Sequence, residues 1–264
     1  MRLSATQPSF DDLSLHMHGP VAVVTLRRAH KRNALSDGLV LALEHTFSHL
    51  PEGARAAVLT GDGAHFCAGL DLSELQARST IDGLHHSRMW HRAFAAVERG
   101  NVPVVAALHG AVVGGGMELA SSCHIRVADE TAFFAFPEGT RGIFVGGGGS
   151  VRTPKLIGEH RMLDMMLTGR VYKAAEAVQV GFAQYLTPAG SAMAKALELA
   201  ERIASNAPMT NYALLHALPR IAEQSADHGF FTEALMASIV ETAPEAQQRI
   251  GEFLDGRGPK VRAG

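Results

Sequence analysis

Hydrophobic residues recur in short runs along the first half of the chain. VAVVTL (21–26), AAVLTG (56–61) and IRVAD (125–129) are rich in β-branched residues and end near glycine or a charged residue, which predicts buried strands. VPVVAALHG (102–110) and AFFAF (132–136) have the same character. Segments with helical spacing of apolar residues separate these runs, so the pattern predicts an α/β fold.

Helical patterns dominate the rest of the chain. SDGLVLALEHTFSHL, with Ser36 as its N-cap, and MELASSCH are predicted helices within the strand-rich part. KAAEAVQVG ends on Gly181 as a C-capped helix does, and further helices are predicted over 190–205, 208–222 and 229–254. We therefore expect an α/β core followed by a helical C-terminal third.

Composition and charge exclude several classes of protein. The 264 residues are 47% hydrophobic and 19% charged, with a net charge of -2, which suits a sizeable core and neither a nucleic-acid surface nor a polybasic membrane anchor. No segment approaches the about 20 apolar residues of a membrane span, and residues 1–19 lack the apolar run of a signal peptide. Cys67 and Cys123 have no CxxC spacing, so we expect a cytoplasmic protein without a disulfide framework.

The run GGGMELA (114–120) places three glycines directly before a helical stretch that contains Glu118. It matches neither the GxGxxG dinucleotide fingerprint nor the GxxxxGK phosphate loop. GGGGSVR lacks the GxSxG nucleophile elbow, so Ser150 is predicted to be a helix N-cap. His45 and His49 lack the intervening glutamate of HExxH, and no metal site is expected.

Backbone amides at the start of the helix after the glycine run are suited to bind developing negative charge. The first turn of a helix leaves its N–H groups without helical partners, and the helix dipole is positive there. A second such amide is predicted in HFCAGLDL (65–72), where Gly69 permits close approach and a turn would expose the amide of Leu70. Together the two amides would form an oxyanion hole.

HFCAGLDL, followed by VVAALHGAVVGGGMELASSCHIRVAD (104–129), resembles the enoyl-CoA hydratase/isomerase (crotonase) superfamily, and the resemblance covers nearly the whole chain. It implies an α/β crotonase-like spiral of ββα units over 1–195, which holds the acyl-CoA site, and a C-terminal helical trimerisation region over 196–264. It also implies a homotrimer, or a hexamer built as a dimer of trimers. No cofactor is implied, because coenzyme A is part of the substrate.

The resemblance also implies a reaction and the residues that perform it. Carried over by position, the backbone amides of Leu70 and Gly115 bind the thioester oxygen and stabilise an enolate. Hydratases of the family use two glutamates, and Glu118 and Glu138 stand at the matching positions. The implied enzyme adds water across the double bond of a trans-2-enoyl-CoA to give a 3-hydroxyacyl-CoA, with Glu118 activating water and Glu138 supplying a proton.

Substrate contacts are implied around the two glycine-containing loops. The residues expected to contact the acyl-CoA are Ala68, Gly69 and Asp71, Arg32 and Ala34 in the preceding turn, Gly114, and Gly146. Asp71 is also expected to hold the oxyanion loop. Met89, Trp90 and Phe94 are expected either to line the acyl pocket or to belong to the core, because an apolar helical stripe serves either purpose.

The segment after Glu138 departs from the family pattern. GTRGIFVGGGGSVR has Val145 where proline is frequent, and Arg141 stands close to the acid. Arg141 is expected either to bring charge near the acyl chain or to face solvent or a subunit contact. Two alternative functions stay open: a Δ3,Δ2-enoyl-CoA isomerase, which needs only one carboxylate base near Glu138, and a non-catalytic acyl-CoA-binding regulator, which the altered segment 139–145 keeps open.

Overall fold

The computed structural model describes residues 7–74 and 79–258, so the first six residues of the segment inspected for a signal peptide lie outside it. The chain divides into two compact units, Met1–Ala204 and Ser205–Gly264, which are described separately. Among the described residues, none of the helices combines the length and the apolar character needed to cross a membrane.

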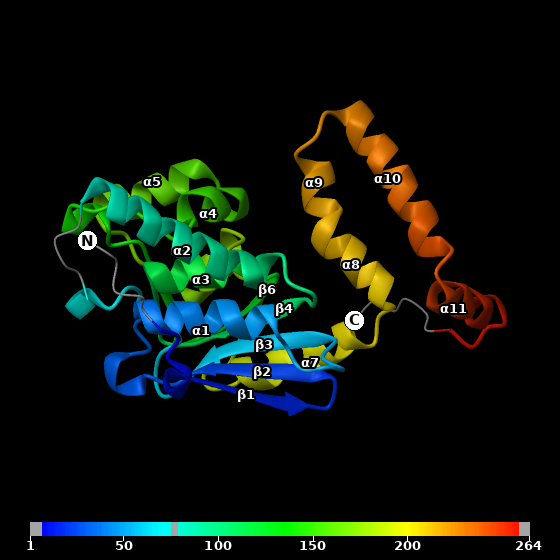
Figure 1. Cartoon of the computed structure of the whole chain (residues 1–264), viewed down its shortest axis with the longest axis horizontal. Helices are drawn as coiled ribbons and strands as arrows, with labels where there is room; N and C mark the ends of the chain where they lie inside the picture. Colours follow the sequence, from blue (N-terminus) through cyan, green and yellow to red (C-terminus); the bar gives the residue numbers. More distant parts are fainter. Residues whose placement is uncertain (1–6, 75–78, 259–264) are drawn as a thin grey trace. The chain divides into compact units, whose positions relative to one another are not determined.

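A mixed sheet forms the centre of the first unit (Figure 1). Its strands, in spatial order, are β1 (Leu13–His18), β2 (Val21–Leu26), β3 (Ala56–Gly61), β4 (Val104–Leu108), β6 (Ile125–Asp129) and β9 (Tyr185–Thr187). β1 pairs antiparallel with β2, and the successive pairs from β2 to β9 are parallel. A smaller sheet contains, in order, β5 (Ala111–Val113), β7 (Phe133–Ala135) and β8 (Tyr172–Lys173).

Both faces of the central strands are buried, as is typical of parallel sheets. In β2, Ala22, Val24 and Leu26 belong to one hydrophobic cluster, whereas Val21 and Val23 belong to another. The first cluster includes residues of α1 (Asp37–Ser48), α2 (Thr80–Glu98) and α3 (Gly115–Ser122), and the second includes residues of α7 (Ala192–Ala204). Figure 1 shows these helices on opposite sides of the sheet, so the predicted strands are confirmed as buried core.

The remaining elements of the first unit are short. They are α4 (Gly149–Ile157), α5 (Glu159–Thr168), α6 (Ala174–Gln179) and the 3-10 turns η1 (Phe10–Asp12), η2 (Ala29–Lys31), η3 (Leu72–Glu74) and η4 (Gly139–Arg141). Ser36 is confirmed as an N-cap, because its hydroxyl accepts the amide of Leu39 at 3.2 Å. The prediction for Ser150 is wrong: Gly148 occupies the N-cap of α4 with φ +98°, a left-handed conformation that favours glycine.

The second unit consists of α8 (Pro208–His216), α9 (Leu218–Ala222), α10 (Ala226–Glu241) and α11 (Pro244–Leu254). The helices predicted over 208–222 and 229–254 are each interrupted. Pro219 and Pro244 lie in the first turns of α9 and α11, because proline lacks the N–H that would continue the preceding helix. The boundary predicted at 195/196 falls within α7, which packs on the sheet of the first unit.

Candidate active site

The AGLD loop is fixed on both sides by backbone pairing. Cys67 donates its amide to Ala111 at 2.9 Å, and the Leu35 amide donates to Gly69 at 2.7 Å. Gly69 has φ +96°, and a Cβ atom there would lie 2.7 Å from the carbonyl oxygen of Val113. The loop therefore requires glycine at position 69 in order to approach the neighbouring chain so closely.

The glycine run brings a second amide to the same place. Gly114 is the N-cap of α3, with φ +52°, and Gly115 is the first helical residue. A Cβ atom on Gly115 would lie 3.3 Å from the amide nitrogen of Leu70. Neither the Leu70 nor the Gly115 N–H has an acceptor among the described residues, so both are available to one external oxygen.

Glu118 is held one turn into α3 by two amides, one from the loop that precedes α4 and one from the first residue of α4. Glu118 is 3% exposed, and its Oε1 accepts the N–H groups of Gly147 and Gly149, each at 2.8 Å. Burial raises the pKa of Glu118, whereas these two amides and the charge of Arg152 oppose that rise. The sequence therefore places a buried carboxyl with fixed orientation in the same helix as the Gly115 amide.

Glu138 packs against the first glycine of the run in a different setting. It is 7% exposed, and its Oε2 has no hydrogen-bond partner among the described residues. A Cβ atom on Gly114 would lie 2.6 Å from its Oε1, which brings the carboxyl against the glycine run. Burial, with a further contribution from the charge of Glu118, raises the pKa of Glu138 to about 7. Such a carboxyl can donate or accept a proton near neutral pH.

The structure thus brings together two unpaired amides and two electrostatically coupled carboxyls. Comparison of the sequence with known families identifies the family of the chain. The sequence profile described as enoyl-CoA hydratase/isomerase matches residues 16–261. This chain belongs to the enoyl-CoA hydratase/isomerase family. An acyl-CoA thioester substrate fits this family.

Individual members of the enoyl-CoA hydratase/isomerase family are similar in sequence to this chain over most of its length. A short-chain-enoyl-CoA hydratase of Clostridium acetobutylicum is 34% identical over 202 residues, which are 75% of this chain and 77% of that protein. An enoyl-CoA hydratase of Mycobacterium tuberculosis is 30% identical over 263 residues, which are 98% and 99% of the two chains. The crystal structure of a Rhodopseudomonas palustris protein, assigned as an enoyl-CoA hydratase, superposes with a TM-score of 0.94 and 55% identity over 96% of this chain and 98% of that chain. The predicted α/β crotonase fold with C-terminal helices is thereby confirmed.

The turn at residues 32–34, which the family resemblance implies contacts coenzyme A, packs directly against the AGLD loop. The carbonyl of Arg32 accepts the amide of Ala68 at 3.0 Å, and Arg32 itself is left-handed with φ +53°. The carbonyl of Ala34 accepts a guanidinium N–H of Arg28 at 2.6 Å. The residues named from the resemblance therefore lie together, although their contacts with a ligand stay a prediction.

Asp71 is occupied by internal contacts. Its carboxylate pairs with Arg28 at 2.9 Å and with Lys31 at 3.0 Å, and it accepts the Ser73 hydroxyl at 2.6 Å. Burial alone would raise the pKa of Asp71, but hydrogen bonds from Ser73, Lys31 and Arg28 hold it well below its usual range. These contacts join the turn to the loop, in agreement with the expected role of Asp71 in holding the oxyanion loop.

Asn33 was not singled out from the sequence although it organises this turn. It is fully buried in a left-handed conformation, with φ +55°. Its Oδ1 accepts the amide of Arg28 at 2.9 Å, and its Nδ2 donates to the carbonyls of Asp62 and His65 at 2.8 and 2.7 Å. Asparagine is one of the few non-glycine residues that tolerate this conformation, so an Asn in a basic turn was the available signal.

Trp90 lies between the two glycine loops. A Cβ on Gly115 would lie 2.8 Å from Trp90 Cζ3, and one on Gly147 would lie 3.1 Å from Trp90 Cε3. Phe94 packs edge-on against the indole of Trp90, with the ring centroids 5.5 Å apart, and both aromatic side chains are buried. Gly146 faces the same helix, since a Cβ there would lie 3.0 Å from the Ser87 hydroxyl. The indole thus limits the space beside both loops.

The divergent segment after Glu138 is mostly exposed. Arg141 lies at the surface, but its charge opposes the upward shift in the pKa of Glu138. Phe144 is exposed, whereas Val145, at the position where proline is frequent, is buried. Arg141 therefore faces solvent, as one of the two expectations has it, while its position relative to an acyl chain stays a prediction.

Proposed function

We propose that this protein is an enoyl-CoA hydratase that converts a trans-2-enoyl-CoA into a 3-hydroxyacyl-CoA. The observation that carries the proposal is the presence of two buried carboxyls, Glu118 and Glu138, next to the glycine run that supplies one of the unpaired amides of Leu70 and Gly115. Hydration needs one group to take a proton from water and one to give a proton to carbon, and a two-carboxyl site supplies both.

The proposed reaction begins when the thioester oxygen accepts the Leu70 and Gly115 amides. Glu118 removes a proton from water as the water oxygen bonds to the β carbon, and the π electrons of the double bond move toward the thioester. The two amides stabilise the resulting enolate oxygen, an effect worth about 10² to 10³ in rate for each donor. Glu138 then donates its proton to the α carbon, and transfer of one proton from Glu118 to Glu138 restores the site.

The decisive experiment follows loss of the conjugated enoyl-thioester absorbance with short, medium and long 2-enoyl-CoAs. Wild type should hydrate at least one of them, whereas Glu118→Gln and Glu138→Gln should each lower kcat by about 10² to 10⁴. Binding of acyl-CoA without hydration of any substrate would reject the proposal and favour the non-catalytic regulator.

Isomerisation of a 3-enoyl-CoA is the second candidate, favoured by the unpartnered Oε2 of Glu138. A single carboxylate suffices to move a proton between two carbons. If 3-enoyl-CoA is the better substrate and Glu118→Gln retains activity while Glu138→Gln loses it, isomerase replaces hydratase.

Assembly into a homotrimer or hexamer belongs to the same proposal. Several large apolar side chains of the second unit are exposed within the described residues, including Phe230, Phe231, Leu235, Phe253 and Leu254. Apolar groups at this density favour burial against another chain. Light scattering coupled to size-exclusion chromatography should give a mass of three or six chains, and a monomer would contradict this part. We also propose a cytoplasmic location and no cofactor beyond the substrate's own coenzyme A.

A further inference from the structure

The loop that holds Glu118 contains no side chain that could fix it. Residues 146–149 are all glycine, and glycine loses the most conformational freedom when it is ordered. Nevertheless the amides of Gly147 and Gly149 both meet one oxygen of Glu118 at 2.8 Å. Such a convergence requires contacts from outside the loop.

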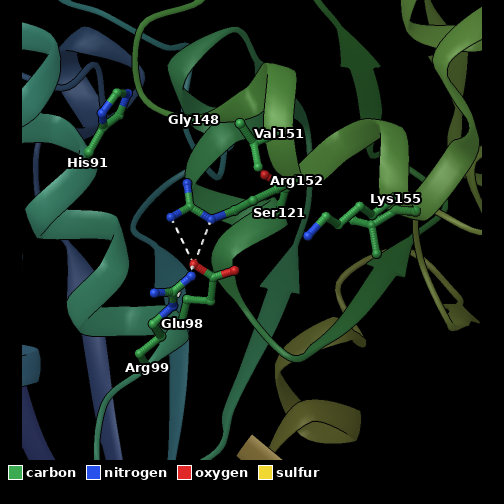
Figure 2. Close-up of a pocket in the computed structure, with 9 residues that line it drawn as sticks. His91, Glu98, Arg99, Ser121, Gly148, Val151, Arg152 and Lys155 are labelled. Atoms are coloured by element: carbon green, nitrogen blue, oxygen red, sulfur yellow. Dashed lines mark hydrogen bonds and ion pairs between the residues drawn. The ribbon is translucent and has the colours of Figure 1, made fainter. Parts of the chain in front are cut away.

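Arg152 supplies such a contact from the first turns of α4. Its Nη1 donates to the carbonyl of Gly147 at 3.0 Å. Its Nε and Nη2 both donate to Glu98 Oε2, at 3.0 and 2.9 Å. Figure 2 shows the guanidinium directed at the Glu98 carboxylate. Glu98 is the last residue of α2, so a continuous series of hydrogen bonds runs from α2 through Arg152 and Gly147 to Glu118.

The guanidinium also packs against the backbone of Gly148, the N-cap residue that connects the loop to α4. Gly148 has φ +98°, and a Cβ atom there would overlap Arg152 Nη1. The Arg152 side chain is 12% exposed, whereas the Glu98 side chain is 34% exposed at the wall of a cavity of about 280 Å³. Charge-assisted hydrogen bonds of a largely buried arginine are among the stronger polar contacts, and a planar guanidinium can hold the carboxylate and the carbonyl at once.

We propose that Arg152, held by Glu98, is a positioning residue that fixes the Gly147 and Gly149 amides around the Glu118 carboxylate. The inference rests on the proposed function for its catalytic consequence, but not for its structural one. Arg152 acts through the loop and is not itself expected to contact the reacting atoms. Its positive charge also favours the ionised form of Glu118, which a base requires.

The structural consequence is measured by hydrogen–deuterium exchange, without any substrate. In Arg152→Gln, peptides covering 142–152 should exchange about tenfold or more faster than in wild type, because a hydrogen bond to a charged group is lost. Peptides covering β3 and β4 should exchange as in wild type, which separates a local release of the loop from general destabilisation. Arg161→Gln is the matched control, since Arg161 Nη1 also donates to a backbone carbonyl, that of Ile157, at 2.7 Å.

The catalytic consequence is a split between kcat and KM. Arg152→Gln should lower kcat about 10- to 100-fold with KM changed less than about threefold, because Glu118 is mispositioned while the substrate contacts remain. Arg152→Lys should recover part of the loss, since an ammonium cannot hold both partners in the same plane. Glu98→Gln should lower kcat less than Arg152→Gln does. Combining the two substitutions should lower kcat no further than Arg152→Gln alone, because both break the same series of hydrogen bonds. Arg161→Gln should match wild type.

The two proposals fail in different ways. A wild type that hydrates no enoyl-CoA rejects the hydratase, while the exchange measurement still decides the role of Arg152. Exchange over 142–152 that is the same in Arg152→Gln as in wild type overturns the inference. If wild type is active, an Arg152→Gln variant with the wild-type kcat overturns it as well. If Arg152→Gln does not fold, Arg152→Lys and Glu98→Gln are measured in its place, and wild-type exchange over 142–152 in both would overturn the inference.

Discussion

Glu118 and Glu138 lie in two regions of one site that are built in opposite ways. Around Glu118, two loop amides meet the same oxygen, and Arg152 holds one residue of that loop. Around Glu138, one oxygen has no partner among the described residues. Burial raises the pKa of both carboxyls, but donated hydrogen bonds from the glycine loop favour the charged form of Glu118. The two groups are coupled, because the charge of Glu118 contributes to the raised pKa of Glu138.

The difference teaches how two identical side chains acquire distinct roles. A carboxylate that receives fixed donors is suited to act as a base, since those donors favour its ionised form against the effect of burial. A carboxyl in a poorly solvated setting keeps its proton to higher pH and is suited to act as an acid. The environment, and not the residue type, therefore separates the proposed base from the proposed acid.

Gly114→Ala is expected to disturb the region of Glu138 most strongly. The added Cβ would lie 2.6 Å from Glu138 Oε1 and would force an alanine into φ +52°. Displacement of the acid should lower kcat about 10²-fold, and backbone strain should cost about 1–3 kcal/mol in the free energy of unfolding.

Gly83→Ala is the matched control for that substitution. Gly83 lies in α2 with nothing within 4 Å of an added Cβ. Alanine there should stabilise the protein by about 0.5–1 kcal/mol and leave kcat unchanged. Equal kcat for Gly114→Ala and wild type would show that the glycine run does not constrain Glu138.

The pH dependence of kcat tests the assignment of acid and base. If Glu138 donates a proton, hydration should fall about tenfold for each pH unit above its pKa, because the protonated fraction falls at that rate. The pKa of Glu138 is raised to about 7 by burial and by Glu118, so the decline should begin near neutral pH. A rate that instead rises with pH through this range, and still does so in Glu118→Gln, would require ionised Glu138 and would favour the isomerase.

A smaller effect of Glu138 is expected on the pH dependence of the melting temperature, Tm. The folded-state pKa of Glu138, about 7, exceeds the ordinary value of 4.5, so its contribution to stability is full below pH 4.5 and is lost as pH rises through about 7. Glu138→Gln has no charge to bury and should avoid that loss. Its Tm relative to wild type should therefore rise by a few degrees between about pH 5 and about pH 8, where each kcal/mol corresponds to about 2–4 °C.

An exposed carboxylate provides the control for the Tm comparison. Glu52 lies at the surface in the loop after α1. Glu52→Gln should show the same Tm difference from wild type at both pH values. If Glu138→Gln behaves in the same way, the Glu138 carboxyl does not titrate differently in the folded and unfolded chains.

Local patterns were sufficient for much of the fold and insufficient for the contacts that organise the site. VAVVTL, AAVLTG and IRVAD form strands with the predicted bounds, because β-branched runs flanked by charge or glycine suit a buried sheet. Strand β1 was not predicted, since it lies at the edge of the sheet and most of its side chains are exposed. Ser150 has a favourable N-cap side chain, but the left-handed backbone that starts α4 favours glycine at 148.

The site shows the same limit. Leu70, Gly115, Glu118 and Glu138 could be named because the family motifs contain them. The contact between Arg152 and Glu98 could not, since it joins residues 54 positions apart and depends on where α2 ends against α4. Long-range pairs of this kind leave no periodic signal in one sequence, so the structure was needed to find what holds Glu118.

Leu70→Ala is expected to have the smallest effect, although Leu70 contributes one of the two amides. Its side chain is half-buried and takes no part in the proposed chemistry, so kcat should change by less than about threefold. Gly115→Ala adds one carbon at the partner amide, where a Cβ would lie 2.8 Å from Trp90, and should lower kcat far more. Measured side by side, the two variants separate the amide from the side chain. A loss in Leu70→Ala as large as that in Gly115→Ala would mean that the Leu70 side chain, and not its backbone alone, shapes this region of the site.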